Sequence, residues 1–322
     1  MAATGKKETE KVFAHLMREV HFDLCMNCGA CIASCPLGSL GLADGRPALK
    51  GSCTACGLCY EQCPQISTDQ EIAERVFGEK PEPDSIGFYE KAYSAQTKLP
   101  DVQVRAQDGG AVTTLLISLL EKGFIDGAVV MGVGEDPWRP EPRVATTREE
   151  LIECAGTKYS PAPSLVGVRE AVDYYSLDEL ALVGVPCQIK ALRQMDTGEK
   201  PARRITSSVK LAVGIFCMKA FPYDGFFRKV IEDQLDLDLS EIAKFDIKKG
   251  NFIIYREGKP KRELGLKGLA QFSFLPCGLC SDFTAELADV SIGSTGSPSG
   301  YSTVLLRTPV GIQAFNQAIR VR

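Results

Sequence analysis

Apolar segments alternate between strand-like and helix-like patterns over most of the chain, from about residue 87 onward. Largely apolar runs of strand length lie at 125–131, 180–185 and 209–216. Helix-like patterns lie at 112–120, 164–174 and 188–194. This alternation predicts an α/β (α+β) domain with a largely parallel sheet.

Shorter patterns complete this domain. Thr147 is followed three residues later by Glu150, a capping box that predicts a short helix. An amphipathic stretch over 223–235 predicts a further helix, and 251–255 reads as a short strand. The chain closes on a helix-like segment from residue 311.

The first 86 residues follow a different pattern. Residues 1 to about 20 are charged and predict a short helix or arm, and 21–68 contain a cysteine-rich internal repeat. Residues 69–86 are polar and become rich in proline, which is typical of a linker. The sequence therefore predicts a small module over 1–68, a linker over 69–86 and a large domain over 87–322.

The repeat consists of two cysteine runs, CMNCGACIASCP at 25–36 and CTACGLCYEQCP at 53–64. This is the spacing with which a bacterial-ferredoxin-like module holds a pair of [4Fe-4S] clusters. The fourth cysteine of each run ligates the other cluster. The first cluster is therefore assigned to Cys25, Cys28, Cys31 and Cys63. The second is assigned to Cys53, Cys56, Cys59 and Cys35.

Zinc and disulfides are the alternative readings of these cysteines. Zinc sites usually combine two C-x2-C pairs or mix cysteine with histidine, and His15 and His21 are the chain's two histidines. Disulfide frameworks belong to short secreted chains, whereas this charged N-terminal segment does not resemble a secretory signal. The spacing favours clusters over both.

Five cysteines lie outside the repeat. Cys187 and Cys217 follow predicted strands, and Cys277 and Cys280 form a C-x2-C pair. A single cysteine after a strand is more often a core residue than a ligand, but these four together match the number that a third [4Fe-4S] cluster needs. Cys154 falls within a predicted helix and is expected to pack in the core.

Composition excludes two classes of partner. The formal net charge of −4 gives no indication of nucleic-acid binding. No apolar run reaches the eighteen or so residues of a membrane span, so we expect no direct membrane insertion. Cluster-binding thiolates also require a reducing compartment, which favours a cytoplasmic location.

Three loops suit a phosphate-bearing cofactor. Residues 107–110 (QDGG) lead into a helix, 156–160 (GTKYS) combine glycine, hydroxyl, cation and ring, and 293–300 form a Gly/Ser loop. The fragment at 132–134 runs on into Pro137, so a Rossmann nicotinamide site is not supported. Each loop considered alone is also consistent with an ordinary turn.

The large domain resembles the beta-subunit family of coenzyme F420-reducing hydrogenase. The resemblance is carried, in order, by AQDGG (106–110), AGTKY (155–159), VGVPCQ (183–188), FCMK (216–219), PCGLCSD (276–282), ADVSIG (288–293) and YSTVLLR (301–307). It covers about residue 87 to the end of the chain. The cysteine-rich module ahead of it is similar to that of the electron-input subunit of F420H2 dehydrogenases.

This resemblance implies a bound FAD, a [4Fe-4S] cluster inside the large domain, and coenzyme F420 as substrate. It assigns the domain cluster to Cys187, Cys217, Cys277 and Cys280. The flavin site would draw on Gly109, Gly110, Thr113, Thr157, Lys158, Tyr159, Gln188 and Lys219. The hydride step itself requires no acid–base pair, and no catalytic residue is assigned.

The implied function is an F420 oxidoreductase subunit, with hydride transfer between F420H2 and FAD and single-electron transfer through the clusters. Its partner would be another subunit of a hydrogenase, formate dehydrogenase, heterodisulfide reductase or F420H2 dehydrogenase. Two alternatives stay open. One is a ferredoxin-dependent flavin reductase of a small organic or pigment substrate, and the other is a passive electron-transfer subunit without a flavin.

Overall fold

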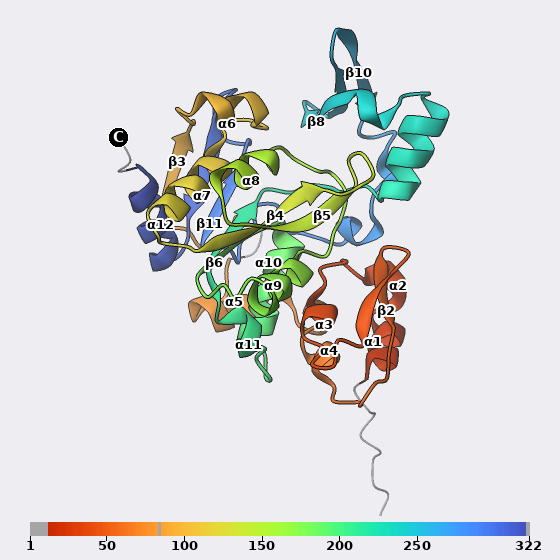
Figure 1. Ribbon diagram of the computed structural model, residues 1–322, viewed down its shortest axis with the longest axis vertical. Helices are drawn as coiled ribbons and strands as arrows, with labels where there is room; N and C mark the ends of the chain where they lie inside the picture. The colour runs from red at the N-terminus through yellow and green to blue at the C-terminus, as the bar shows by residue number, and fades with distance from the viewer. Residues whose placement is uncertain (1–11, 83–84, 320–322) are drawn as a thin grey trace, which may run out of the picture.

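A computed structural model describes residues 12–82 and 85–319. Its largest element is a seven-stranded sheet in the order β3-β12-β11-β7-β6-β4-β5 (Figure 1). The strands are β3 (Lys91–Ala95), β4 (Gly127–Val133), β5 (Pro140–Ala145), β6 (Leu180–Gly184), β7 (Val209–Ile215), β11 (Val290–Gly293) and β12 (Ser302–Leu306).

The sheet is mixed rather than largely parallel, which corrects the sequence-based expectation. The four central strands, β11, β7, β6 and β4, pair in parallel, with Leu182 opposite Ala212. Strands β12 and β3 on one side and β5 on the other pair in antiparallel fashion. The central strands are buried and apolar, so the hydrophobic pattern of the sequence predicts them. Strand β3 is mostly exposed and β5 contains two prolines, so neither has such a pattern.

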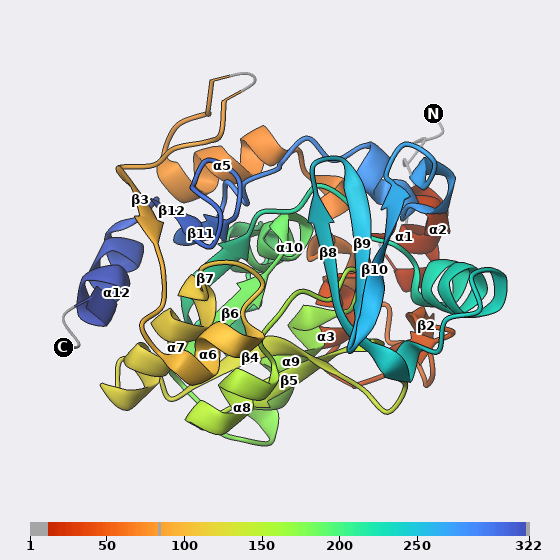
Figure 2. The same ribbon diagram turned by 90° about the horizontal axis from the view of Figure 1, so that it is seen from above.

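Helices cover both faces of this sheet (Figure 2). One face packs against α6 (Pro100–Arg105), α7 (Ala111–Glu121), α8 (Arg148–Glu153) and α12 (Pro309–Ile319). The other packs against α5 (Asp69–Phe77), α9 (Ser164–Asp173), α10 (Pro186–Thr197) and α11 (Arg203–Thr206). The helices expected near 112, 148, 164 and 188 are all present. Thr147 forms the expected capping box at α8.

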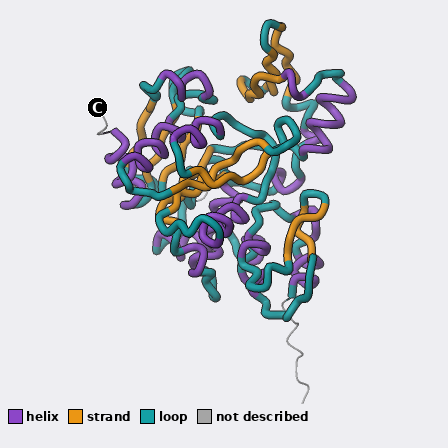
Figure 3. The backbone as a smooth tube through the Cα atoms, in the orientation of Figure 1, coloured by secondary structure: helices purple, strands orange, loops and turns teal. Residues whose placement is uncertain are grey.

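The cysteine-rich module lies beside the second face (Figure 3). It comprises α1 (Phe13–Glu19), α2 (His21–Leu24), α3 (Ala30–Ala33), α4 (Leu58–Glu61), the hairpin β1 (Leu40–Ala43) and β2 (Arg46–Leu49), and the 3-10 turn η1 (Pro64–Ile66). Of the N-terminal arm expected over 1–20, residues 1–11 lie outside the described part, and the rest contains α1. Cys28, Ala30 and Ala33 belong to the core cluster formed by α5, α9 and α10.

The segment expected to be a linker begins with a helix. In α5, Thr68 and Glu71 form a reciprocal capping box, and Ile72 is fully buried against α10. The apolar face of this nine-residue helix is short, so the surrounding polar residues concealed it in the sequence. The module is therefore followed by a packed helix, and the proline-rich residues come after it.

A smaller lobe, residues 223–267, stands apart from the seven-stranded sheet (Figure 1, upper right). We call it the outer lobe. Its three antiparallel strands are ordered β10-β9-β8, namely β8 (Ile242–Lys248), β9 (Asn251–Arg256) and β10 (Lys259–Gly265). The helix expected over 223–235 is present as a π-helix, η2 (Tyr223–Gln234), followed by η3 (Leu239–Glu241). Phe226, Phe227, Phe245 and Phe252 are packed edge to face or tilted in its core.

The 3-10 turns η4 (Ala270–Phe272) and η5 (Leu275–Gly278) lead from the outer lobe back to the large sheet. Among the described residues, no helix is long and apolar enough to cross a membrane.

Candidate cluster and cofactor sites

The cysteines of each run in the module are presented by the same backbone turn. In the first run Asn27 and Gly29 adopt left-handed φ values of 54° and 85° on either side of Cys28. In the second run Ala55 and Gly57 do the same on either side of Cys56, with φ values of 55° and 77°. Backbone turns of alternating hand direct N–H groups to one concave side, which suits an anionic thiolate–cluster unit. The glycines then begin α3 and α4.

Cys25, Cys28, Cys31 and Cys63 gather as the cysteine spacing predicts; we call them the first set. Burial is the main cause of the raised pKa of Cys28, and charge repulsion from Cys63 and Cys25 adds to it. The pKa of Cys31 is raised by burial and by Cys28, Cys25 and Cys63. Burial raises the pKa of Cys63 to about 12, with repulsion from Cys25. These mutual effects identify four neighbouring thiols.

Cys53, Cys56, Cys59 and Cys35 form the second set. All four line one small cavity between the two halves of the module. Burial raises the pKa of Cys59 to about 11, and repulsion from Cys56, Cys53 and Cys35 contributes. Cys53 and Cys56 are exposed, whereas Cys59 is buried. Two of the four cysteines of this set therefore approach solvent.

Cys187, Cys217, Cys277 and Cys280 form the third set. Cys187 is the second residue of α10, just beyond the carboxyl end of β6, and Cys217 follows β7. Burial raises the pKa of Cys187 well above its usual range, and repulsion from Cys217, Cys280 and Cys277 contributes. The strand-end cysteines and the C-x2-C pair are thus neighbours in the structure. Cys154, in contrast, ends α8 and packs against the core.

The three sets are neighbours in a fixed order. Cys28 of the first set also raises the pKa of Cys187, after burial and Cys217, so the first and third sets adjoin. Cys59 of the second set contributes to the raised pKa of Cys31 in the same way. The first set therefore lies between the third and the second. Among the described residues, no group of three or more His, Cys, Asp or Glu side chains is arranged to hold a single metal ion.

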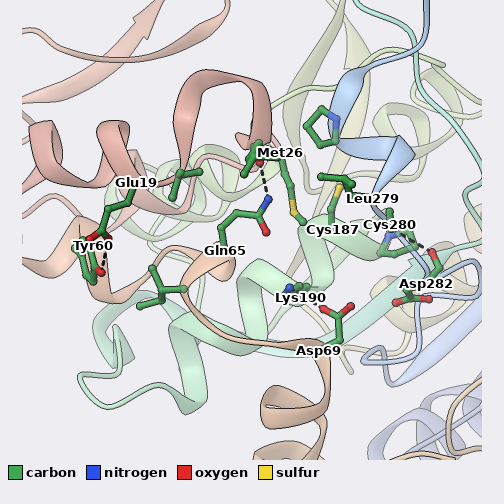
Figure 4. Close-up of a pocket in the computed structure, with 15 residues that line it drawn as sticks. Glu19, Met26, Tyr60, Gln65, Asp69, Cys187, Lys190, Leu279, Cys280 and Asp282 are labelled. Atoms are coloured by element: carbon green, nitrogen blue, oxygen red, sulfur yellow. Dashed lines mark hydrogen bonds and ion pairs between the residues drawn. The ribbon is translucent and has the colours of Figure 1, made fainter. Parts of the chain in front are cut away.

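A pocket of about 340 Å³ lies between the cysteine-rich module and the large domain, and Cys187 and Cys280 of the third set line it (Figure 4). Its walls come from both parts of the chain: Met26 and Gln65 from the module, and Cys187, Cys280 and Leu279 from the large domain. Cysteine thiols open into this space together with apolar side chains. Such a lining fits a thiolate-bound inorganic group held in a partly dehydrated site.

The pocket also contains charged side chains. Lys190 Nζ pairs with Asp69 Oδ1 at 2.7 Å, and Asp282 lies near Cys280 (Figure 4). Burial raises the pKa of Asp282. Sequence reasoning missed Lys190 and Asp69 because neither belongs to a cysteine motif and they lie far apart in the chain.

Two of the loops expected to hold a cofactor meet directly. Gln107 accepts a hydrogen bond from the Thr157 backbone N–H at 3.3 Å. Its Nε2 donates to Asp246 Oδ1 of the outer lobe at 2.9 Å and to the Phe245 carbonyl at 3.2 Å. Gln107 therefore joins the 107–110 loop, the 156–160 loop and strand β8, a role that the sequence did not reveal.

The third loop adjoins the first at Gly109. A Cβ at this position would lie 2.4 Å from the Ala95 carbonyl oxygen and 2.5 Å from the Ser302 nitrogen, just after the 293–300 loop. Gly110 is left-handed, with a φ of 70°, and begins α7 without a side-chain cap. Thr113 is half-buried in the first turn of that helix. The free N–H groups of an uncapped helix N-terminus fit a phosphate of a bound cofactor.

The other expected flavin residues have protein partners in this structure. Lys158 Nζ donates to the carbonyls of Cys154, Ala155 and Gly156, and burial lowers its pKa to about 8. Tyr159 packs against Phe252 of the outer lobe.

Gln188 and Lys219 lie closer to the third set than to these loops. Gln188 accepts from the Val185 N–H and donates to the Ala162 carbonyl, which fixes the start of α10 beside Cys187. The charge of Lys219 acts on Cys277, whose pKa is raised by burial and lowered by this lysine. Of the eight residues expected to bind the flavin, six therefore lie at the junction of the 107–110 and 156–160 loops. The other two, Gln188 and Lys219, lie beside the third set.

Comparison with known proteins finds matches to both parts of the chain. Residues 92–168 and 177–321 match the two families described as the N-terminal and C-terminal parts of the coenzyme F420 hydrogenase/dehydrogenase beta chain. Residues 17–64 match a 4Fe-4S dicluster domain.

The chain is 38% identical over 234 residues to coenzyme F420 hydrogenase subunit beta of Methanosarcina barkeri, covering 73% of this chain and 80% of that one. It is 30% identical over 310 residues to an F(420)H(2) dehydrogenase subunit of Methanosarcina mazei, covering 92% and 83% respectively. A chain of the F420-reducing [NiFe] hydrogenase complex from Methanosarcina barkeri superimposes with a TM-score of 0.70 at 36% identity. That superposition covers 74% of this chain and 81% of the other.

Proposed function

Because the chain belongs to the coenzyme F420 hydrogenase/dehydrogenase beta-subunit family and carries a 4Fe-4S dicluster module, we propose that it is the F420-converting subunit of a larger redox complex. It would exchange a hydride with F420 and single electrons with a partner subunit. The observation that carries this proposal is the contiguous order of the three cysteine sets, from the third through the first to the exposed second.

A flavin would supply the conversion between these two kinds of transfer, since a deazaflavin gives or takes a hydride and a [4Fe-4S] cluster exchanges one electron at a time. Gly109 and Gly110, at the uncapped start of α7, fit its phosphates. Thr113 and Thr157 border the same loop junction. Tyr159 and Phe252 would shield that junction from water on the side of the outer lobe.

The third set is the candidate holder of a cluster beside the flavin. Gln188 fixes the N-terminus of α10, and thereby Cys187, through its hydrogen bonds to Val185 and Ala162. The Cys217 N–H donates to the Phe283 carbonyl at 2.9 Å, which anchors the opposite side. Lys219 adds a positive charge near Cys277. These contacts would orient the ligands and moderate the negative charge of a reduced cluster.

The second set is the candidate exit of the subunit. Residues 51–56 are exposed throughout, and Leu37 and Leu49 beside this set are 56% and 48% exposed. An apolar surface next to solvent-accessible ligands suits the docking of a partner that exchanges electrons. A reducing compartment suits these thiolates, so the cytoplasm is the proposed location.

Anaerobic reduction of the purified chain tests this function. With F420H2 as donor, the flavin absorbance should bleach first, and the broad absorbance of the clusters should then decrease. NADH and NADPH serve as matched hydride donors and should leave both bands unchanged.

Two results would contradict the proposal. Bleaching by NADPH without bleaching by F420H2 would overturn the donor. A spectrum without flavin bands in the freshly purified chain would instead favour a passive electron-transfer subunit.

A further inference from the structure

The outer lobe carries a concentration of positive charge that the proposed function does not use. Residues 244–267 contain eight Lys or Arg against three Asp or Glu, a net charge of +5, although the whole chain carries −4. Strand β10 is exposed along nearly its full length, so its charged side chains face solvent. A local excess of this size attracts anions and raises their concentration near the surface.

This charge lies next to the candidate cofactor loops. Lys244 Nζ donates to the Gln107 carbonyl at 2.9 Å. Lys248 Nζ lies 3.2 Å from Asp108 Oδ1 and 2.9 Å from Asp246 Oδ2. One end of β8 is thus fastened to the loop that begins α7, and the carboxylates of Asp108 and Asp246 neutralise Lys248. Figure 2 shows β8, β9 and β10 side by side, with the helix η2 on one side and α6 and α7 on the other.

Two lysines at the same end of the lobe are not neutralised. Lys249, the residue after Lys248, adopts a left-handed φ of 49° in the turn that joins β8 to β9. The Leu266 N–H donates to the Gly250 carbonyl at 2.9 Å, which sets Lys267 beside this turn. Both lysines are exposed, and neither forms an ion pair with a carboxylate of the described residues.

We propose that Lys249 and Lys267 bind the acidic tail of coenzyme F420, an inference that rests on the proposed function. The side chain of this deazaflavin carries a phosphodiester followed by glutamate carboxylates, so it is a flexible polyanion. With its ring against the flavin at the junction of the 107–110 and 156–160 loops, the tail of F420 would extend past Asp108 to the turn of the outer lobe. Two exposed lysines on flexible four-carbon stems suit a flexible polyanion better than a rigid bidentate site would.

The test uses the flavin- and cluster-containing chain with F420H2 as donor and a viologen dye as acceptor. In K249Q/K267Q the KM for F420H2 should rise about fivefold to tenfold, while kcat stays within about twofold. The matched control K229Q/K259Q removes the same charge from exposed positions of the outer lobe away from the turn, and its KM should stay within about twofold. The Kd of oxidised F420, measured by fluorescence titration, should follow the same pattern.

A tail-less donor separates tail binding from ring binding. The reduced deazaflavin riboside lacks both the phosphodiester and the glutamates, so its KM should be the same for wild-type chain and K249Q/K267Q. Raising the salt concentration from about 50 mM to about 300 mM should weaken F420 binding more in the wild type than in the variant.

The outcomes distinguish this inference from the proposed function. A wild-type chain that neither oxidises F420H2 nor binds F420 would overturn both. A wild-type chain that turns over F420H2, with an unchanged KM and Kd in K249Q/K267Q, would overturn the tail site alone. An equal rise in KM for the riboside and for F420H2 would also overturn it, because the lysines would then act on the ring site.

Discussion

Lys190 Nζ lies 2.7 Å from Asp69 Oδ1, and this ion pair joins α10 to the helix that follows the cluster module. The lysine side chain is only 12% exposed and borders the pocket between the cysteine-rich module and the large domain. Its charge also lowers the pKa of Cys63, which burial raises. A single cation is thus placed close to Cys63 of the first set and in the pocket that Cys187 of the third set lines.

Replacing Lys190 by methionine should lower the reduction potential of the nearest cluster by some tens of millivolts, because a nearby positive charge favours the reduced, more negative state. A redox titration followed by electron paramagnetic resonance measures this shift. Lys190→Arg keeps the charge and serves as the control. Equal potentials in the methionine variant and the wild type would show that Lys190 acts only as a structural partner of Asp69.

Cys187→Ser should remove one cluster without affecting the other two. Three clusters correspond to about twelve irons per chain, so the variant should contain about eight. Cys154→Ser is the matched control, because Cys154 packs at the end of α8 away from all three sets. Iron quantitation on anaerobically purified protein decides the matter. About eight irons in the wild type itself would exclude a third cluster.

Gly109→Ala should destabilise the large domain by about 1–3 kcal/mol, because the new Cβ would collide with backbone atoms that cannot move independently. The flavin content should fall as well, since the loop that begins α7 must shift. Gly265→Ala, where a Cβ would meet nothing within 4 Å, provides the control. Thermal unfolding and flavin absorbance measure the two effects. A fully stable Gly109→Ala variant would contradict the packing at this junction.

We expect the ionisation of the Glu286 carboxyl group to lower the free energy of unfolding as the pH rises. Burial, together with the charge of Asp282, raises its pKa from 4.5 to about 7 in the folded chain. A carboxyl group with a raised folded-state pKa contributes stability below its unfolded pKa, and that contribution is lost as the pH rises through about 7.

Glu286→Gln should therefore reduce the loss of melting temperature between about pH 5 and pH 8. Glu257→Gln changes an exposed glutamate at the β9–β10 turn and should leave the pH dependence as it is. The measurement is thermal unfolding at both pH values. An unchanged slope in Glu286→Gln would show that another group controls the pH response.

The sequence allows a sharper prediction for the two cysteine runs than for the flavin loops. Ligand spacing in the two runs is a local property of the chain, so the crossed assignment of Cys35 and Cys63 followed directly from it. No spacing rule applies to flavin contacts. Lys158 and Gln188 fit the expected residue types, but the structure engages both with nearby backbone groups. Such competition between partners depends on tertiary packing and cannot be read from a motif.

The elements that escaped prediction are those with a small apolar face. Strand β3 is mostly exposed, β5 begins with proline, and α5 buries only Ile72 and Ala73. Buried runs such as β6 and β7 could be predicted because most of their residues are apolar. The sequence did not reveal which strands pair in antiparallel fashion. An antiparallel strand at the side of a parallel sheet has no distinctive pattern of apolar and polar residues.

Helix α5 changes how the cluster module relates to the rest of the protein. Because Ile72 is buried against α10, and the Leu165 N–H donates to the Cys28 carbonyl at 3.1 Å, the module is held against the large domain. A separate ferredoxin would have to find its partner by diffusion, at a rate that falls with dilution. Here the encounter is built into one polypeptide. With clusters in the first and third sets, as proposed above, electron exchange between them would proceed at the same rate however scarce the protein is in the cell.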